Sequence, residues 1–279
     1  MAMTINTNVM SLNAQRNTSN NMTSLATTMQ RLSSGLRVNS AKDDAAGLAI
    51  ATRMDTQVRG MNVAIRNAND GISLAQTAEA GMGNITDMLQ RMRELAIQAT
   101  NGTNTTGSGG DVDKLNDEYT QLSLEIERAL QTVSFNGQTL LSGVSTDFTF
   151  QVGANSGDTE RITVSAANMN IGSGALTGVF GTGAASALVT GGATVENSGN
   201  ISAIDDAISA VNTARAKLGA VQSRFENTIS FLRSAVENQA AAKGRIMDAD
   251  FAAETANLSR NQILQQAGTA MIAQANQIP

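Results

Sequence analysis

Two pairs of acidic side chains offer this sequence its best chance of acid–base chemistry. Asp43 and Asp44 are adjacent, and Asp248 and Asp250 are separated by one residue. Two neighbouring carboxyl groups can act as acid and base when their environments push their pKa values apart. Both pairs, however, lie where a helix is expected to begin, and Asp is favoured there because its side chain accepts hydrogen bonds from backbone N–H groups. We therefore interpret both pairs as helix caps.

Most other catalytic groups are absent from the sequence. It contains no Cys and no His, which excludes thiol nucleophiles, imidazole bases and the commonest ligands of transition metals. The glycine-rich segment Gly172-Ser-Gly174 lacks the Lys-Ser/Thr ending of a phosphate-binding loop. We expect a protein that is not an enzyme and has no cofactor or metal.

Charge and hydropathy exclude further classes of protein. The 19 basic and 24 acidic side chains give a net charge of −5, which offers no broad basic surface for nucleic acid. No apolar stretch approaches the length of a membrane-spanning helix, and the first residues lack the basic and apolar regions of a cleaved signal peptide. We expect no nucleic-acid binding, no membrane insertion, and either a cytoplasmic protein or one exported by a route that reads another signal.

The elements that would position any site are mostly helical. The apolar residues are mainly Ala, Leu, Ile, Val and Met, with one tyrosine (Tyr119), no Trp and a single proline at Pro279. This composition favours long helices packed against helices. Two helical ends flank a middle rich in Gly, Thr and Ser.

The first end carries a narrow apolar stripe with spacings of three and four residues. Its members are Met22, Leu25, Met29, Leu32 and Leu36. The helix is expected to stop at Ser33-Ser34-Gly35. A second helix is predicted to begin at Ser40, with Asp43 completing a capping box, and to end near Asn101-Gly102. Its apolar register, from Met54 to Ala96, slips by one position near Ala75, which is typical of a coiled coil with a stutter or stammer.

The remaining elements follow the same reasoning. A third helix is predicted over 113–133, and a β-hairpin from 148–152 and 161–165. A tight turn is expected at Phe135-Asn136-Gly137, and 168–200 is interpreted as a small variable surface insert. The longest stripe alternates spacings of three and four from Ile201 to Val236, with polar residues only at Arg215 and Gln222. After Gly244, a final stripe places Leu264, Met271 and Ile278 one heptad apart, with Gly268 and Ala275 between them.

These patterns predict a mainly α protein: a long antiparallel helical bundle or coiled coil made from both chain ends, with a small β-hairpin region and a short irregular insert. An ordinary antiparallel bundle would explain the middle helices. The two ends are different, because each has a thin apolar seam on a neutral, polar helix that is unlikely to be stable alone. We expect them to pair with each other and with further copies of the chain. The predicted polymerisation seam comprises Met22, Leu25, Met29, Leu32, Leu264, Met271 and Ile278.

Three groups of segments then resemble the bacterial flagellins. They are 5–16 with 32–50, the motif Gln90-Arg-Met-Arg-Glu-Leu-Ala-Ile-Gln98 with 135–143, and 245–254 with 263–277. The match covers most of the chain outside roughly 168–200. The resemblance implies a subunit that self-assembles into the flagellar filament for motility.

The resemblance also implies a domain organisation. The innermost coiled coil would comprise 1–42 with 246–279, and the helical core domain 43–167 with 201–245. The insert at 168–200 would be a reduced form of the family's variable outer domain. Family members continue past Pro279 with a short apolar tail.

Partners and localisation follow from the same resemblance. It implies export through the type III machinery of the flagellum, often with a chaperone bound near the C-terminus, and an extracellular filament. It also implies recognition of the monomer by the host's Toll-like receptor for flagellin. The residues matching that surface are Gln90, Arg91, Glu94, Leu95 and Glu118, and an exposed Leu95 beside Arg91 could anchor a partner. We expect the same residues to contact the next subunit in the filament, so that the receptor sees this surface only on monomers.

Two alternatives remain at this point. A hook–filament junction protein would share the terminal helices, although the intact motif over 90–98 favours flagellin. A surface adhesin or glycan-binding homologue would place its chemistry at 168–200, which lacks the Trp and Tyr that stack on sugars.

Overall fold

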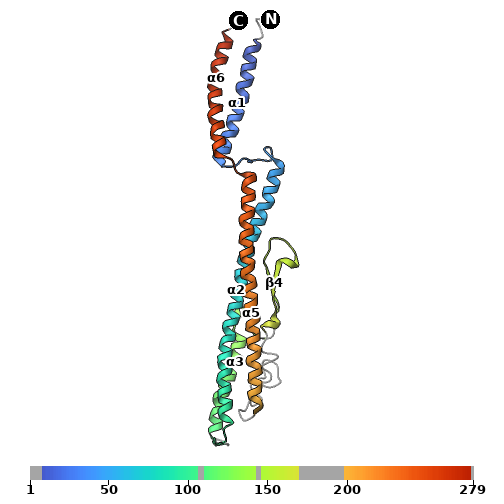
Figure 1. Ribbon diagram of the computed structural model, residues 1–279, viewed down its shortest axis with the longest axis vertical. Helices are drawn as coiled ribbons and strands as arrows, with labels where there is room; N and C mark the ends of the chain where they lie inside the picture. Colours follow the sequence, from blue (N-terminus) through green and yellow to red (C-terminus); the bar gives the residue numbers. More distant parts are fainter. Residues whose placement is uncertain (1–7, 106–109, 143–145, 170–197, 278–279) are drawn as a thin grey trace. The chain divides into compact units, whose positions relative to one another are not determined.

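The computed structural model describes residues 8–105, 110–142, 146–169 and 198–277. Its main helices are α1 (Val9–Ser34), α2 (Ala45–Ala99), α3 (Asp111–Thr132), α5 (Ser198–Met247) and α6 (Phe251–Asn276). The strands are β1 (Ser134–Phe135), β2 (Gln138–Thr139), β3 (Phe148–Gln151) and β4 (Arg161–Val164), with short 3-10 helices at Asp158–Glu160 and Ala166–Asn168. The predicted mainly α fold is confirmed (Figure 1). Most of the predicted insert at 168–200 lies outside the described residues.

The chain divides into two compact units. Residues 1–59 and 235–279 form one, called here the terminal unit, and residues 60–234 form the other, the central unit. The terminal unit holds α1, α6 and the adjoining ends of α2 and α5. The central unit holds the rest of α2 and α5, with α3 and the strands. The domain boundaries implied by the family resemblance stay a prediction.

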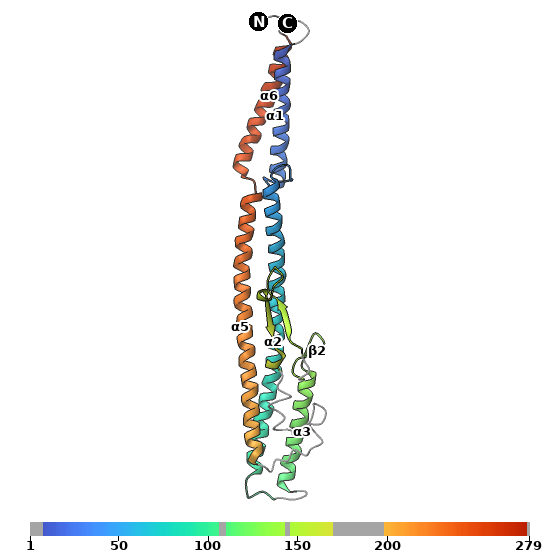
Figure 2. The same ribbon diagram turned by 90° about the vertical axis from the view of Figure 1, so that its right-hand side faces the viewer.

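In the central unit, α2 and α5 run antiparallel beside each other (Figure 2). An ion pair between Arg93 and Asp205, with the Arg93 Nε–Asp205 Oδ1 distance at 2.6 Å, holds one end of this pair. The ring of Phe225 packs against Gly71 farther along, and α3 adds Tyr119 to the same core. Burial raises the pKa of the Tyr119 hydroxyl to about 12, because a phenolate is poorly solvated there.

The buried seam of α2 shows that the predicted phase slip is wrong. From Met61 to Ala96 a series of buried positions alternates by three and four without interruption, and it includes Ala64, Gly71 and Ala75. Leu74, Gly81, Thr86 and Leu95 are buried beside this series. Ile65 and Ile72 are larger and would continue the predicted apolar register, but each is only half-buried. Gly71 belongs in the seam because Phe225 occupies the space above it: a Cβ there would lie 2.5 Å from Phe225 Cζ.

The long stripe of α5 faces this seam, and its two polar members share one partner. Gln222 Nε2 donates a hydrogen bond of 2.9 Å to Glu79 Oε2, and Arg215 Nη2 lies 3.9 Å from Glu79 Oε1. Polar residues at seam positions fix the register of a coiled coil, because a shifted register would leave them unpaired. Glu79 therefore fixes how α2 and α5 align.

The predicted hairpin is confirmed by the antiparallel pairing of β3 and β4, in which Phe148 lies opposite Val164. It is tied to the helices through Phe150, whose ring meets that of Phe225 edge-on with centroids 5.6 Å apart. The predicted tight turn joins β1 to β2, with positive φ values of 49° at Asn136 and 77° at Gly137.

Helix boundaries differ from the predictions at one important place. Helix α1 stops where expected, with Gly35 in the left-handed conformation at φ 71°. Helix α2 begins at Ala45 and not at Ser40, because the Asp43 carboxylate accepts hydrogen bonds from the Ser40 backbone N–H and hydroxyl and closes a turn before the helix. Helix α3 begins at Asp111, two residues earlier than predicted.

Candidate assembly surfaces

The terminal unit brings together the two chain ends, because α1 and α6 lie side by side (Figures 1 and 2). A series of buried and half-buried positions on each helix recurs at alternating spacings of three and four. On α1 this series is Ser11, Ala14, Thr18, Asn21, Leu25, Thr28 and Leu32; on α6 it is Glu254, Leu258, Asn261, Gln265, Gly268, Ile272 and Ala275. Thr27, Arg31, Thr255 and Asn257 are half-buried beside the series. Most of these side chains are polar or small, so the two helices meet along a seam that contains little apolar surface.

Polar contacts and close approach hold this seam. Ser11 Oγ donates a hydrogen bond of 2.7 Å to Asn276 Oδ1, and Asn8 Nδ2 donates one of 2.8 Å to the Ala275 carbonyl. Near the middle, a Cβ added at Gly268 would lie 2.7 Å from Thr18 Oγ1. Hydrogen bonds of this kind contribute only about 0.5–1.5 kcal/mol each to stability, because the unfolded chain makes them with water.

Of the predicted polymerisation seam, only two side chains lie in the α1–α6 contact, and several project outward. Leu25 and Leu32 occupy seam positions and are half-buried. The exposed members are Met22 (54%), Met29 (56%), Leu264 (41%) and Met271 (60%). Ile278 lies outside the described residues. Leu264 and Met271 each lie one position before a residue of the α1–α6 contact, Gln265 and Ile272 respectively.

A short backbone clasp joins the linkers that follow α1 and α5. Leu36 and Asp248 form an antiparallel bridge, in which the Arg37 N–H donates to the Met247 carbonyl at 2.6 Å and the Ala249 N–H donates to the Gly35 carbonyl at 2.9 Å. These two hydrogen bonds give partners to backbone N–H and C=O groups that lie outside the hydrogen bonding of the helices. It holds the start of α6 beside the end of α1.

The carboxylate pairs have structural roles here. Asp44 Oδ1 accepts from the Gly47 N–H, and Asp250 Oδ1 accepts from the N–H groups of Ala252 and Ala253, so both cap helices. Asp43 accepts from Ser40, chiefly through its backbone N–H, which lowers the pKa of the Asp43 carboxyl. Asp248 belongs to the clasp. None of the four is poised as a general acid.

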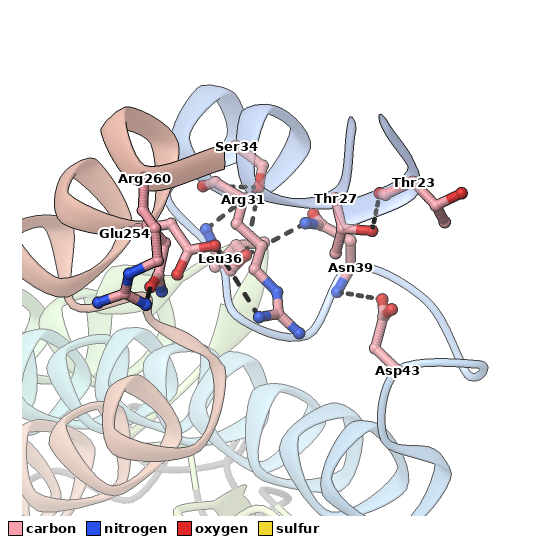
Figure 3. A network of polar contacts seen from close by, with 10 residues as sticks. Thr23, Thr27, Arg31, Ser34, Leu36, Asn39, Asp43, Glu254 and Arg260 are labelled. Carbon is pink, nitrogen blue, oxygen red and sulfur yellow. Dashed lines mark hydrogen bonds and ion pairs between the residues drawn. The ribbon is translucent and has the colours of Figure 1, made fainter. Parts of the chain in front are cut away.

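A polar groove runs between α1 and α6. Its volume is about 570 Å³, and its lining includes Asn20, Arg31, Glu254, Asn257 and Asn261 with several Thr and Ser side chains. Glu254 is buried and lies 3.9 Å from Arg31, measured from Oε1 to Nη1 (Figure 3). Sequence reasoning missed this pair, because the two residues are far apart in the chain and no motif links them.

The predicted receptor surface lies on α2 and α3 of the central unit. Arg91 Nε donates to Glu118 Oε1 at 2.8 Å, and Arg91 Nη1 donates to Glu94 Oε2 at 3.1 Å. The two carboxylates, Glu118 above all, raise the pKa of the Arg91 guanidinium. Gln90 is exposed beside them. The expectation of an exposed Leu95 is wrong: it is fully buried in the same apolar core as Leu89 and Met92.

Among the described residues, none of the helices combines the length and the hydropathy of a membrane-spanning segment. No group of three or more acidic, His or Cys side chains in the same residues could hold a metal ion.

The fold and these surfaces define a helical structural protein whose two ends pair through a polar seam. Comparison with known proteins gives the family. Residues 5–146 match the bacterial flagellin N-terminal helical region, and residues 201–279 match the bacterial flagellin C-terminal helical region. The chain belongs to the flagellin family. It is accordingly a structural subunit of the extracellular flagellar filament, and not an enzyme.

Individual relatives can be aligned with nearly the whole chain. A flagellin of Halalkalibacterium halodurans is 44% identical over 277 residues, covering 99% of this chain and 97% of its own. The flagellin of Bacillus subtilis is 40% identical over 301 residues, covering 99% and 97%. Flagellin D of Vibrio cholerae is 35% identical, covering 100% and 98%, and its alignment spans 372 positions. That span exceeds the 279 residues here, which fits a reduced outer domain.

Proposed function

We propose that copies of this chain assemble by covering the exposed apolar side chains of the α1–α6 pair: Met22, Met29, Leu264 and Met271. The observation that carries this proposal is the inverted arrangement of the terminal unit, in which polar and small residues fill the seam and large apolar residues face outward. Burying one such side chain is worth about 1.5–3 kcal/mol. Leu25, Leu32 and Ile278 complete the proposed polymerisation seam.

Seeded growth tests this role. Purified monomer is added to short filament fragments, and elongation is followed by light scattering and electron microscopy. The double variant Met22→Gln/Met271→Gln should elongate at least about tenfold more slowly than the wild type, because two apolar contacts per subunit are lost. The matched control Met22→Leu/Met271→Leu keeps apolar side chains of similar size and should elongate normally. Unchanged growth of the glutamine variant would exclude this seam.

A second role concerns the Arg91 surface. Gln90, Arg91, Glu94 and Glu118 are the proposed contacts of the host Toll-like receptor on the free monomer, with buried Leu95 supporting them from below. The supporting observation is that two carboxylates hold the Arg91 guanidinium in a fixed, exposed position. Fixed charged groups lose little side-chain entropy on binding.

Receptor signalling in reporter cells tests this second role. Arg91→Ala should reduce the response to monomer by about tenfold or more. A tenfold loss of affinity corresponds to about 1.4 kcal/mol of binding free energy. The control is Arg128→Ala, which removes an exposed arginine of α3 that is paired with Glu125. Equal losses from both variants would show that charge alone, and not this surface, is recognised.

The same exposed face of α6 is proposed to bind the flagellar export chaperone before secretion through the type III route. Ile263, Leu264 and Met271 would be hidden from water in that complex. Leu264→Gln/Met271→Gln should abolish co-elution of the chain with its chaperone in gel filtration, while Met22→Gln should not. Retained co-elution would place the chaperone elsewhere.

A further inference from the structure

Exposed methionine side chains occur, among the described residues, only in the terminal unit. Met10 (65%), Met22 (54%) and Met29 (56%) on α1 and Met271 (60%) on α6 are exposed. In the central unit every described methionine is buried or half-buried. Methionine is a flexible apolar residue that usually fills gaps in a core. Its place on the outside of α1 and α6 therefore needs a reason other than packing within one chain.

These four methionines are the side chains of the described chain that are most open to oxidation. The sequence has no Cys, Trp or His, and its one tyrosine, Tyr119, is fully buried. A peroxide converts the thioether of methionine to a sulfoxide, which is polar and chiral and disrupts interfaces rich in methionine. The peroxide must reach the sulfur, so exposed methionines react before buried ones.

Three of the four methionines belong to the proposed polymerisation seam, and Met10 does not. Met22 and Met29 are one heptad apart on α1 and therefore share a face. Met271 is one heptad from Leu264 on α6. Met10 precedes Met22 by twelve residues, which places it about 120° around the helix. Because Met10 is as exposed as the others, it separates an effect of position from an effect of exposure.

We infer that Met22, Met29 and Met271 are a modification site for peroxides, and that their oxidation blocks addition of the monomer to a growing filament. With hydrogen peroxide, a lone pair of the sulfur attacks one oxygen, an S–O bond forms and the O–O bond breaks. The leaving hydroxide takes the proton of the transferred oxygen and becomes water. The sulfur loses two electrons and the peroxide gains them. Each sulfoxide then places a polar group where the seam needs an apolar one.

This inference rests on the proposed assembly function, and it predicts that monomer and filament differ in sensitivity. In the monomer the three side chains face water, whereas the proposed contact covers them in the filament. Peroxide should therefore act on subunits before they add and spare those already added. The change is reversible, because methionine sulfoxide reductases restore the thioether, with one enzyme for each sulfoxide epimer. Oxidation should slow growth until the sulfoxides are reduced, without shortening existing filaments.

Seeded growth of peroxide-treated monomer tests the inference on the full chain. Wild-type monomer is treated with hydrogen peroxide, the peroxide is removed, and peptide mass spectrometry locates the added oxygen. Treated monomer should elongate at least about tenfold more slowly than untreated monomer, because apolar contacts of the seam become polar. Incubation with both kinds of methionine sulfoxide reductase should restore the untreated rate. Circular dichroism should show an unchanged helix content, since Met82 and Met92 in the core are fully buried.

Two leucine variants identify the methionines that are responsible. Leucine is apolar and similar in size but has no sulfur to oxidise. Met22→Leu/Met29→Leu/Met271→Leu should elongate at the wild-type rate both before and after treatment. The matched control Met10→Leu removes an equally exposed methionine from another face of α1, and peroxide should slow it as much as the wild type. In preformed filaments, mass spectrometry should show Met22 and Met271 oxidised at least about tenfold more slowly than in the monomer.

The outcomes separate this site from the proposed function. Normal elongation of monomer that carries sulfoxide at all three positions would overturn the inference, and slow growth of Met22→Gln/Met271→Gln would leave the seam in place. Slowing of the triple leucine variant by peroxide would also overturn the inference, because another methionine would then be responsible. Equal oxidation of monomer and filament would do the same, since the three side chains would not be covered. Untreated wild-type monomer that fails to elongate would overturn the assembly proposal and this inference with it.

Discussion

The helices of the two units pack against each other through opposite kinds of side chain. In the central unit, α2, α3 and α5 enclose large apolar side chains such as Leu89, Ile126 and Phe225, all fully buried. In the terminal unit, α1 and α6 meet through residues such as Ser11, Thr18 and Gly268, while Met22 and Met271 face outward. The central unit therefore contains its own source of stability, and the terminal unit lacks most of it. The difference suits a subunit that must be folded before assembly and completed by assembly.

The largest expected effect is a contrast in hydrogen exchange of the monomer. Amides around Leu89 and Phe225 should open only with global unfolding, at about 5 kcal/mol or more, whereas those around Thr18 and Gly268 should open at about 0–2 kcal/mol. Exchange followed by mass spectrometry measures both. Asn21→Leu/Thr28→Leu places apolar residues in the terminal seam and should increase protection of α1. Equal protection of the two units in the wild type would contradict the comparison.

Two phenylalanines of α5 give the next effect. Phe225→Ala should lower the free energy of unfolding of the central unit by about 3–5 kcal/mol, because the ring fills the space between Gly71 and Phe150. Urea denaturation followed by circular dichroism measures this change. Phe231→Ala, six residues along the same helix, should change it by no more than about 0.5 kcal/mol, since that ring is exposed. Similar losses of stability from both variants would mean that Phe225 does not lie deeper in the core than Phe231.

Replacing two glycines of α2 by alanine should change the stability in opposite directions, and by less than Phe225→Ala does. Alanine normally stabilises a helix by about 0.5–1 kcal/mol relative to glycine, and Gly83→Ala should do so because nothing lies within 4 Å of the new Cβ. Gly71→Ala should instead destabilise by about 1–3 kcal/mol, because the Cβ would overlap the Phe225 ring. Thermal melting of both variants decides this. Stabilisation by Gly71→Ala would show that Phe225 can move aside.

The smallest effect is an acid transition in the terminal unit. Asp55 Oδ1 accepts from Lys243 Nζ at 2.5 Å, and Oδ2 accepts from Arg59 Nε at 2.7 Å; these hydrogen bonds lower the pKa of Asp55 below its ordinary 3.8. A lowered pKa contributes stability that is present above pH 3.8 and lost as the pH falls through the folded-state value. Carboxyl NMR should show a midpoint below 3.8 for Asp55. Asp55→Asn should remove this part of the acid sensitivity, and a midpoint at or above 3.8 would refute the pairing.

Much of this could be predicted from the sequence. Regular spacing of apolar residues gave the helices, and Gly35, Asn136 and Gly137 marked turns because few other residues adopt positive φ. Motifs over 90–98 and at both ends indicated the family. These signals are local, since each depends on residues a few positions apart.

Only the tertiary structure decided which side chains face inward. Apolar spacing predicts large residues in the seam, but close helix approach favours small ones, so Gly71 is a seam position while Met271 is exposed. Leu95 was expected on the surface but is buried, because a neighbouring helix covers it. Pairs such as Arg31 with Glu254 and Glu79 with Gln222 join residues more than 140 positions apart. The spacing of residues determines a helix and its stripe, but which stripe becomes buried depends on the partner helix and on how closely it can approach.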